Sequence, residues 1–323
     1  MSRTIVGVLR GGTSNEYALS LKTGAALLSA LPEEKYDTRD ILVDKSGVWH
    51  SRGIPMDAPR ALAQIDVVLN GLHGGAGEDG TVQRLLDRAG VAYAGSRARG
   101  AAVSLNKSLS HEILQKAGIQ MPRAVSFTLN NQIDTGEMAQ AVFSQFGPPY
   151  IVKPVNDGAS HGIRFAVNLL ELPDAIGDIL DEYGAALIEE FVLGDEVSVG
   201  VIDNYRGQEL YVLPPAHVHY PDESKFLTHH VHENATAKYE CPSNFTHEEK
   251  QAIEEMARTA HRALELSHFS RADIILTRRG PYLLEVNALP GLYSGASLPV
   301  MLEAVGASTG EFVEHAIGLA KQY

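Results

Sequence analysis

The first hundred residues alternate short apolar runs with stretches in which apolar residues recur at helical spacing. Residues 4–9 form an apolar, β-branched run. The Gly-rich loop RGGTSNE leads from it into a helical pattern over residues 16–28, for which Ser14 is a suitable N-cap. The same alternation predicts strands over residues 37–43 and 66–70 and, after the loop GLHGGAGEDG, a helix over residues 81–89. This order indicates an α/β layer with a parallel sheet, whose ligands bind where the two Gly-rich loops fall.

The pattern changes after residue 105. Asn106 can cap a helix over residues 107–117, and the paired prolines Pro148-Pro149 mark a turn into the apolar run YIVKP. We therefore expect a compact α+β unit, with strands at 124–129, 150–154 and 163–167 and helices at 137–146 and 173–181.

The pattern over the last part of the chain, residues 187–323, predicts a larger sheet. The segments LIEEFVLGDEVSVGVI and ELYVL predict mostly antiparallel strands, with helices over residues 247–264 and 308–321 packed on them. Residues 214–246 have weak periodicity, which is typical of a mobile lid. The predicted organisation is an α/β protein of three domains with a lid loop, at residues 1–105, 106–186, 187–323 and, for the lid, 214–240.

A hairpin near the C-terminus gathers oxygen ligands. Asp273 opens the apolar run IILT, a turn follows at Arg278-Arg279-Gly280, and the run YLLEV returns to Glu285 and Asn287. Residues two apart on a strand point to the same face, so two carboxylates and an amide converge. Such a set suits Mg²⁺ or Mn²⁺, which prefer oxygen ligands and share their shell with phosphates. The alternative is a surface hairpin with acidic ends.

Composition narrows the function classes. The chain has 323 residues, 44% hydrophobic and 21% charged, with a formal charge of −13, so no nucleic acid or anionic membrane is expected as a partner. Cys241 is the single cysteine, which excludes an intrachain disulfide and thiolate metal clusters. The N-terminus lacks a signal-peptide pattern and no apolar stretch reaches about 18 residues, so we expect a cytoplasmic location.

In so acidic a chain, individual lysines become candidate anion ligands. Lys153 ends the strand YIVKP beside the loop VNDGASHG, whose backbone N–H groups can cradle a polyphosphate, although no Walker A sequence is present. Lys107 and Lys225 are further candidates. The segment LIEEFVLGDE offers carboxylates beside apolar residues, as recognition of adenine and ribose requires. The alternative for each lysine is a solvated surface position.

Taken together, these residues resemble the ATP-grasp fold, and most closely its D-alanine–D-alanine ligase family. The resemblance covers essentially the whole chain in order, and its most specific parts are the LHG-x-x-GEDG and EVN-x-x-PG motifs. The matching segments are GGTSNE, LHGGAGEDGTVQ, SLNKSLSHEIL, IVKPVNDGASHG, LIEEFVLGDEVSV and NALPGLYSGASLP. The resemblance implies three α/β domains, with ATP between the second and third.

The resemblance also implies roles for individual residues around the nucleotide. Lys107 and Lys153 would bind phosphates, and Lys225 on the lid would reach the terminal ones. Glu189 would contact the adenine amino group, Glu190 and Val192 would offer backbone contacts to the base, and Glu196 would bind ribose. Two Mg²⁺ or Mn²⁺ ions would be held by Asp273, Glu285 and Asn287.

Around the amino-acid substrates the implied roles are as follows. Glu16 would bind the ammonium of the first substrate, His73 would lie near its carboxylate, and Arg271 with the Gly291 backbone would stabilise the oxyanion. Ser160 in the phosphate loop and Phe226 on the lid would also face the site. Ser297 and Leu298 would bind the carboxylate of the second substrate, although the segment between Gly291 and Ser297 is one residue longer than the family pattern.

The implied reaction joins two D-alanines for peptidoglycan precursor synthesis. The first carboxylate attacks the γ-phosphate of ATP, and the second amine attacks the resulting acyl phosphate while the lid excludes water. We expect D-alanine and ATP as small-molecule substrates and a homodimer as the assembly.

Two positions depart from the family pattern. Ala159 and Phe226 replace a serine and a tyrosine, so two hydroxyls are missing together, which indicates a repacked site. A ligase that joins D-alanine to D-lactate or D-serine is therefore an alternative, and a non-catalytic nucleotide-binding protein is a third. The lid histidines lack a matching carboxylate pattern, so we expect contacts with substrate, phosphate or solvent for them and no metal site. They are His217, His219, His229, His230 and His232.

Overall fold

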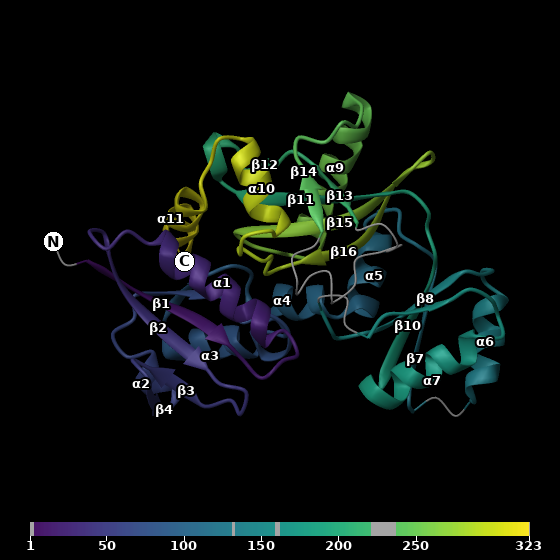
Figure 1. Ribbon diagram of the computed structural model, residues 1–323, viewed down its shortest axis with the longest axis horizontal. Coiled ribbons are helices and arrows are strands. Elements are labelled where there is room, and N and C mark those ends of the chain that lie inside the picture. Colours follow the sequence, from purple (N-terminus) through teal and green to yellow (C-terminus); the bar gives the residue numbers. More distant parts are fainter. Residues whose placement is uncertain (1–2, 131–132, 159–161, 221–236, 323) are drawn as a thin grey trace.

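The computed structural model describes residues 3–130, 133–158, 162–220 and 237–322. These residues form three β-sheets with helices packed against them (Figure 1). The mixed α/β class predicted from the sequence is confirmed. None of the helices in the described ranges combines the length and the apolar composition that a membrane crossing requires.

The first sheet has the strand order β4-β3-β2-β1-β5-β6. β1 runs parallel to β2 and β5, and β5 runs parallel to β6, while β3 and β4 add an antiparallel edge. Its elements are β1 (Thr4–Gly11), α1 (Tyr17–Ala30), β2 (Tyr36–Val43), β3 (Trp49–Ser51), β4 (Ile54–Met56), α2 (Ala58–Ala61), β5 (Val67–Asn70), α3 (Thr81–Ala89) and β6 (Ala92–Ala94). The loops after β1 and β5 leave the sheet at its carboxyl edge, as the parallel order predicts.

Two helices lead to the second sheet, whose order is β7-β10-β8-β9 and whose pairs are antiparallel. Asn106 ends the first helix and caps the second by accepting a hydrogen bond from the Leu109 amide at 2.9 Å, as predicted. The elements are α4 (Ala98–Leu105), α5 (Lys107–Lys116), β7 (Ala124–Thr128), α6 (Thr135–Phe143), β8 (Tyr150–Pro154), β9 (Arg164–Ala166), α7 (Leu172–Tyr183) and β10 (Ala185–Glu190).

The third sheet has the order β14-β13-β11-β15-β16, with β12 also paired to β11, and all these pairs are antiparallel. A capping box between Thr246 and Glu249 starts its long helix α9. The elements are β11 (Asp195–Asp203), β12 (Leu210–Val212), β13 (Ala216–His219), β14 (Lys238–Glu240), α9 (His247–Ala263), β15 (Phe269–Thr277), β16 (Gly280–Asn287), α10 (Ser297–Ala304) and α11 (Thr309–Ala320).

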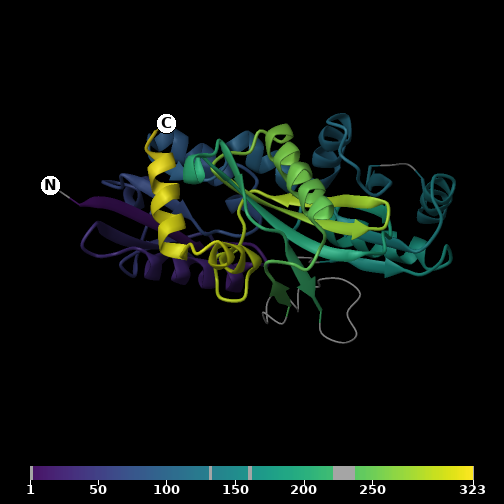
Figure 2. The same cartoon turned by 90° about the horizontal axis from the view of Figure 1, so that it is seen from above.

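The first and third sheets share one hydrophobic core. Val8 and Leu69 of the first sheet, Ile202 of the third, Met301 of α10 and Phe312 of α11 belong to the same buried cluster. The C-terminal helix α11 thus lies beside α1, although the two helices are far apart in the sequence (Figure 2). The second sheet has a separate core with α6 and α7. The third sheet also packs against α9 in a further buried cluster, so the second and third sheets have separate cores.

Two expectations about local structure were wrong. The N-cap of α1 is Glu16, whereas the Ser14 hydroxyl lies before the helix, donates to the His73 carbonyl at 2.5 Å and accepts from the Glu16 amide at 3.2 Å. The expected lid also contains core elements at its ends, because Ala216 and Val218 of β13 are buried and β13 pairs with β11 and β14. The part of the lid between these strands, residues 221–236, lies outside the described residues.

Candidate active site

The hairpin of β15 and β16 brings the predicted metal ligands together. Asp273 lies opposite Glu285, and Arg271 lies opposite Asn287, as the hairpin prediction required. Nδ2 of Asn287 is 3.2 Å from Oδ2 of Asp273, and Nη2 of Arg271 is 2.6 Å from the same oxygen. The two carboxylates and the amide therefore share one face of the sheet.

A bulge interrupts this hairpin. Asp273 pairs with Glu285 but Ile274 pairs with Leu283, so Leu284 is left out of the register. Leu284 and Glu285 both line the same cavity, although neighbouring residues of a regular strand point to opposite faces. The bulge thus places an apolar side chain beside a carboxylate on the wall of the site.

That cavity, of about 270 Å³, lies between the second and third sheets. It has cationic, apolar and acidic parts, as a site for a nucleotide with its phosphates requires. It brings together most of the residues predicted to bind nucleotide or metal: Lys107, Lys153, Glu189, Glu190, Val192, Glu196, Asp273 and Glu285.

The strands of the second sheet supply a buried ion pair to this cavity. Nζ of Lys153 on β8 lies 2.7 Å from Oε2 of Glu189 on β10, and both side chains are buried. The neighbouring Glu190 carboxylate accepts from Nε of Arg123 at 2.7 Å. Glu190 and Val192, which lies in the segment between β10 and β11, both line the cavity, and their predicted backbone contacts with the base stay predictions.

Charges around Glu285 keep it ionised. Its carboxylate lies 3.4 Å from Nζ of Lys107, the first residue of α5. Burial opposes ionisation, but Lys107, Lys153 and Arg271 outweigh it and lower the pKa of Glu285 to about 2. An anionic oxygen is therefore present at this point across the physiological range.

Glu196 at the start of β11 behaves in the opposite way. Burial raises its pKa to about 7, although its hydrogen bond from the Tyr220 hydroxyl favours the ionised form. Tyr220 also lines the cavity and was missed from the sequence. It follows β13 in a segment whose weak periodicity gave no signal of a strand.

A second cavity of about 40 Å³ adjoins the hairpin on the side of the first sheet. Four residues predicted for the amino-acid substrates line it, Glu16, His73, Arg271 and Gly291, together with the predicted metal ligands Glu285 and Asn287. The remaining lining residues had no predicted role; they are Leu19, Glu78, Gly158, Leu289 and Tyr293. Glu285 lines both cavities and so connects them.

Glu16 is one of the residues that line this second cavity. Its side chain is buried, and among the described residues Oε1 has no hydrogen-bond partner. Burial, together with the charges of Glu78 and Asp157, raises the pKa of Glu16 well above its usual value. A cation bound beside it would offset both effects, as the predicted substrate ammonium would.

Glycines from two loops pack directly against Glu16. A Cβ at Gly158 would overlap Oε1 of Glu16, and a Cβ at Gly74, whose φ is +67°, would lie 2.8 Å from the same atom. The glycines of VNDGASHG and GLHGGAGEDG therefore admit this carboxylate between the phosphate loop and the first sheet.

His73 is held in place by two contacts. Nε2 lies 2.6 Å from Oγ1 of Thr23 on α1, and Nδ1 lies 3.5 Å from Oε1 of Glu78. The ring is almost completely buried. These partners fix the imidazole at the wall of the second cavity.

The structure separates the two residues predicted to bind the second substrate from the cavity walls. The Leu298 side chain packs in the core shared by the first and third sheets, and its backbone lies in the first turn of α10. The Ser297 side chain is buried, and its Oγ has no partner among the described residues. Gly291 lines the second cavity, where a Cβ would lie 2.6 Å from Cε1 of Tyr293.

The predicted site residues Ser160, Lys225 and Phe226, and the substituted position Ala159, lie outside the described residues. Their roles stay predictions.

The hairpin residues fit a divalent cation. Asp273 and Glu285 supply carboxylate oxygens on one face, and the Asn287 amide lies 3.2 Å from the first and 3.5 Å from the second. Rotation of that amide about its last bond would present its oxygen in place of nitrogen. An all-oxygen set beside two lysines is suited to a magnesium ion that also contacts phosphates.

Comparisons with known proteins agree with this arrangement. The family model described as D-ala D-ala ligase C-terminus matches residues 113–318, and the one described as D-ala D-ala ligase N-terminus matches residues 50–96. The D-alanine–D-alanine ligase of Geobacter sulfurreducens is 33% identical, covering 97% of this chain and 93% of that protein. The corresponding ligase of Anaeromyxobacter sp. (strain K) is 31% identical, covering 96% and 94%.

Solved structures show the same fold. The VanG D-Ala:D-Ser ligase from Enterococcus faecalis has a TM-score of 0.84 at 25% identity and covers 99% of this chain and 100% of its own. The D-alanine–D-alanine ligase from Bacillus anthracis complexed with ATP has a TM-score of 0.81 at 24% identity, with coverage of 99% and 98%.

Proposed function

Because the chain belongs to the D-alanine–D-alanine ligase family and is therefore an ATP-dependent ligase, we propose that it forms the peptide bond between two D-alanine molecules. The single observation that best supports this assignment is the position of Glu285. It lines both the larger cavity, whose lysines suit a nucleotide, and the smaller one, whose Glu16 suits an ammonium. A phosphoryl group and an amino-acid carboxylate would meet beside it.

In the first step the D-alanine ammonium binds Glu16, and its carboxylate points toward the nucleotide. A carboxylate oxygen attacks the γ-phosphorus of ATP and ADP leaves, so an acyl phosphate forms. Lys107 and Lys153 bind the phosphate oxygens on which charge accumulates. Mg²⁺ or Mn²⁺ bound by Asp273, Glu285 and Asn287, when present, supplies further charge neutralisation there.

In the second step the free amine of another D-alanine attacks the acyl carbon and inorganic phosphate leaves. Arg271 lies at the wall of the smaller cavity, and among the described residues its Nε has no hydrogen-bond partner. This N–H is therefore available to the oxyanion, together with the backbone N–H of Gly291. Ser297 and the Leu298 backbone would bind the carboxylate of the second substrate.

The test is phosphate release from ATP by the full-length protein with Mg²⁺, with and without D-alanine, followed by mass measurement of the product. We expect release that depends on D-alanine and a product with the mass of the dipeptide. ATP turnover without any condensed product would contradict the proposal.

A second candidate differs in the nucleophile. One structural relative is a D-Ala:D-Ser ligase, and Ala159 and Phe226 remove two hydroxyls from the expected second-substrate region. The test adds D-serine or D-lactate together with D-alanine and measures the mass of the products. A mixed product indicates one of these ligases, whereas D-alanyl-D-alanine alone indicates a ligase specific for the dipeptide.

A further inference from the structure

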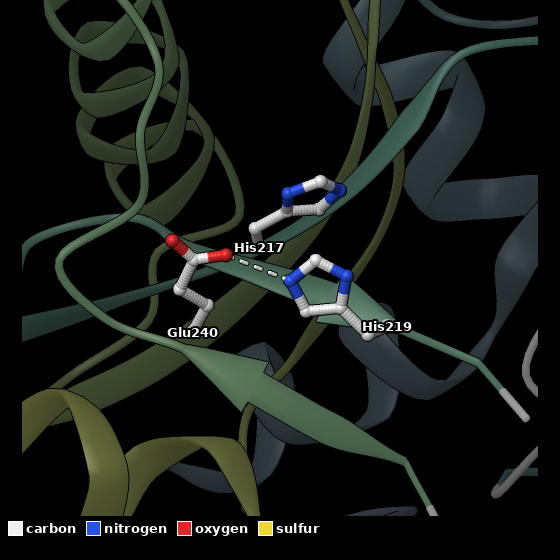
Figure 3. A group of neighbouring side chains, drawn as sticks. All are labelled: His217, His219 and Glu240. Atoms are coloured by element: carbon white, nitrogen blue, oxygen red, sulfur yellow. Dashed lines mark hydrogen bonds and ion pairs between the residues drawn. The ribbon is translucent and has the colours of Figure 1, made fainter.

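Three potential metal ligands converge on the paired strands β13 and β14, away from the acidic hairpin of β15 and β16, although His217 also lines the larger cavity. One ligand atom from each of His217, His219 and Glu240 lies within 4.8 Å of the other two. Figure 3 shows the two imidazoles and the carboxylate grouped at neighbouring strands. We propose that these three residues form a binding site for a divalent transition-metal ion such as Zn²⁺.

Strand geometry explains why the three side chains meet. His217 and His219 are two apart on β13, so their side chains leave the same face, and their ring centroids are 4.2 Å apart. Glu240 on β14 is the cross-strand partner of His217. Its Oε2 lies 2.9 Å from Nε2 of His219. The carboxylate that the spacing of the histidines lacked is therefore supplied by strand pairing, from a residue 21 positions beyond His219.

The surroundings of His217 favour a bound ion. Asp195 Oδ1 lies 3.8 Å from its Nε2, while its Nδ1 is buried and has no hydrogen-bond partner among the described residues. The ring also packs against Phe245, with centroids 5.0 Å apart, which restricts its orientation. A metal-bound histidine commonly presents one ring nitrogen to the ion and the other to a carboxylate.

The donor set selects the kind of ion. Two imidazoles and one carboxylate are suited to Zn²⁺, Cu²⁺ or Ni²⁺ and are poor ligands for Mg²⁺, which prefers oxygen. Ligands around tetrahedral Zn²⁺ are about 3.4 Å apart. The His219–Glu240 pair, at 2.9 Å, would have to open slightly, and any pair near the 4.8 Å limit would have to close. His219 and Glu240 are exposed, with side-chain accessibilities of 44% and 46%, and can make that adjustment.

The test measures Zn²⁺ binding to the full-length protein by competition with a fluorescent zinc chelator, in excess Mg²⁺. We expect one site per chain and a loss of at least about tenfold in affinity in His219→Ala and in Glu240→Gln. Visible absorption of bound Co²⁺ gives a second readout, because His219→Ala should remove one imidazole ligand. The matched control is His50→Ala, since His50 also lies 2.9 Å from a carboxylate, that of Asp44.

Variants of other histidines test whether Zn²⁺ binds elsewhere in the protein. His73→Ala tests the cluster of Glu16, His73 and Glu78 in the smaller cavity. A triple change of His229, His230 and His232 to Gln tests the histidines between the two strands. Retention of the site in both variants supports the proposal. The proposal would be overturned if either variant lost Zn²⁺ binding or if His219→Ala bound Zn²⁺ as tightly as the wild type. A wild-type Kd above roughly 100 μM would also overturn it.

Discussion

Nζ of Lys153 lies 2.7 Å from Oε2 of Glu189, with side-chain accessibilities of only 7% and 5%. The two residues come from adjacent strands, β8 and β10, and form part of the nucleotide cavity wall. Without nucleotide, the lysine is thus compensated by a carboxylate. A phosphate would offer it a second anionic partner.

Removing one member of this pair should destabilise the nucleotide-free protein. In Lys153→Met, Glu189 keeps a buried charge without its partner, and we expect a loss of about 3 kcal/mol in the free energy of unfolding. Adding Glu189→Gln to this variant should restore more than half of the loss, because the charge is then removed. Urea unfolding of the single and double variants measures both effects, and strict additivity would show that the pair is not coupled.

Neutralising Glu285 should stop the reaction while leaving the fold intact. Glu285→Gln retains the shape but not the charge that offsets bound metal ions, so phosphate release should fall by at least about a hundredfold. The control is Glu182→Gln, since Glu182 is exposed and pairs with Arg164 at the surface. Activity near wild type in Glu285→Gln would remove the basis for the metal assignment.

Adding one methyl group at Gly158 should disturb the first substrate. In Gly158→Ala the new Cβ overlaps Oε1 of Glu16, which must move or force the loop away. We expect a rise in KM for the first D-alanine of roughly tenfold or more, from a misplacement of about 1 Å. Gly147→Ala is the matched control, because a Cβ there meets no atom within 4 Å. Equal KM values in the two variants would argue against contact between Glu16 and the substrate.

Glu196 should make stability depend on pH. Its folded-state pKa, about 7, lies above the ordinary value of 4.5, so the folded protein holds this proton more tightly. The resulting stabilisation is complete below about pH 4.5 and is lost as the pH rises through 7. Glu196→Gln cannot ionise, so its Tm relative to wild type should increase from about pH 5 to about pH 8. The corresponding difference in the free energy of unfolding should change by on the order of 2 kcal/mol over this range. A Tm difference that stays constant with pH would contradict the raised pKa.

The choice of nucleophile should be visible in a competition between D-alanine and D-lactate. A D-alanine amine becomes more protonated, and so less nucleophilic, as the pH falls, whereas the hydroxyl of D-lactate is unaffected. If the apolar Phe226 faces the second substrate, the depsipeptide share should increase from about pH 9 to about pH 6. If the dipeptide is the sole product at every pH, Phe226 has a packing role and does not select the nucleophile.

The sequence predicted those parts of the fold that depend on local signals. The strand Tyr150–Pro154 and the helix after Asn106 agree with their predicted starting points, because a proline turn and an N-cap mark them. The short strands β3 and β4 and the helices α4 and α10 were missed, since their runs are too brief or too weakly patterned to be recognised.

The site residues that belong to sequence motifs could be predicted, whereas contacts that depend on the pairing of distant strands could not. Lys153, Glu189 and Glu285 line the cavity that the family resemblance implied. The contacts of Tyr220 with Glu196, and of Glu240 with His219, join residues more than 20 positions apart and depend on strand register, which no local pattern specifies.

The bulge at Leu284 gives the site wall a side chain that a regular strand would not place there. Because side chains alternate along a strand, a β16 without Leu284 would still pair Leu283 with Ile274 on the core face and Glu285 with Asp273 on the site face. Only the apolar side chain beside the carboxylate would be lost. A deletion of this one residue should therefore change the lining of the cavity and leave the phase of the strand unchanged.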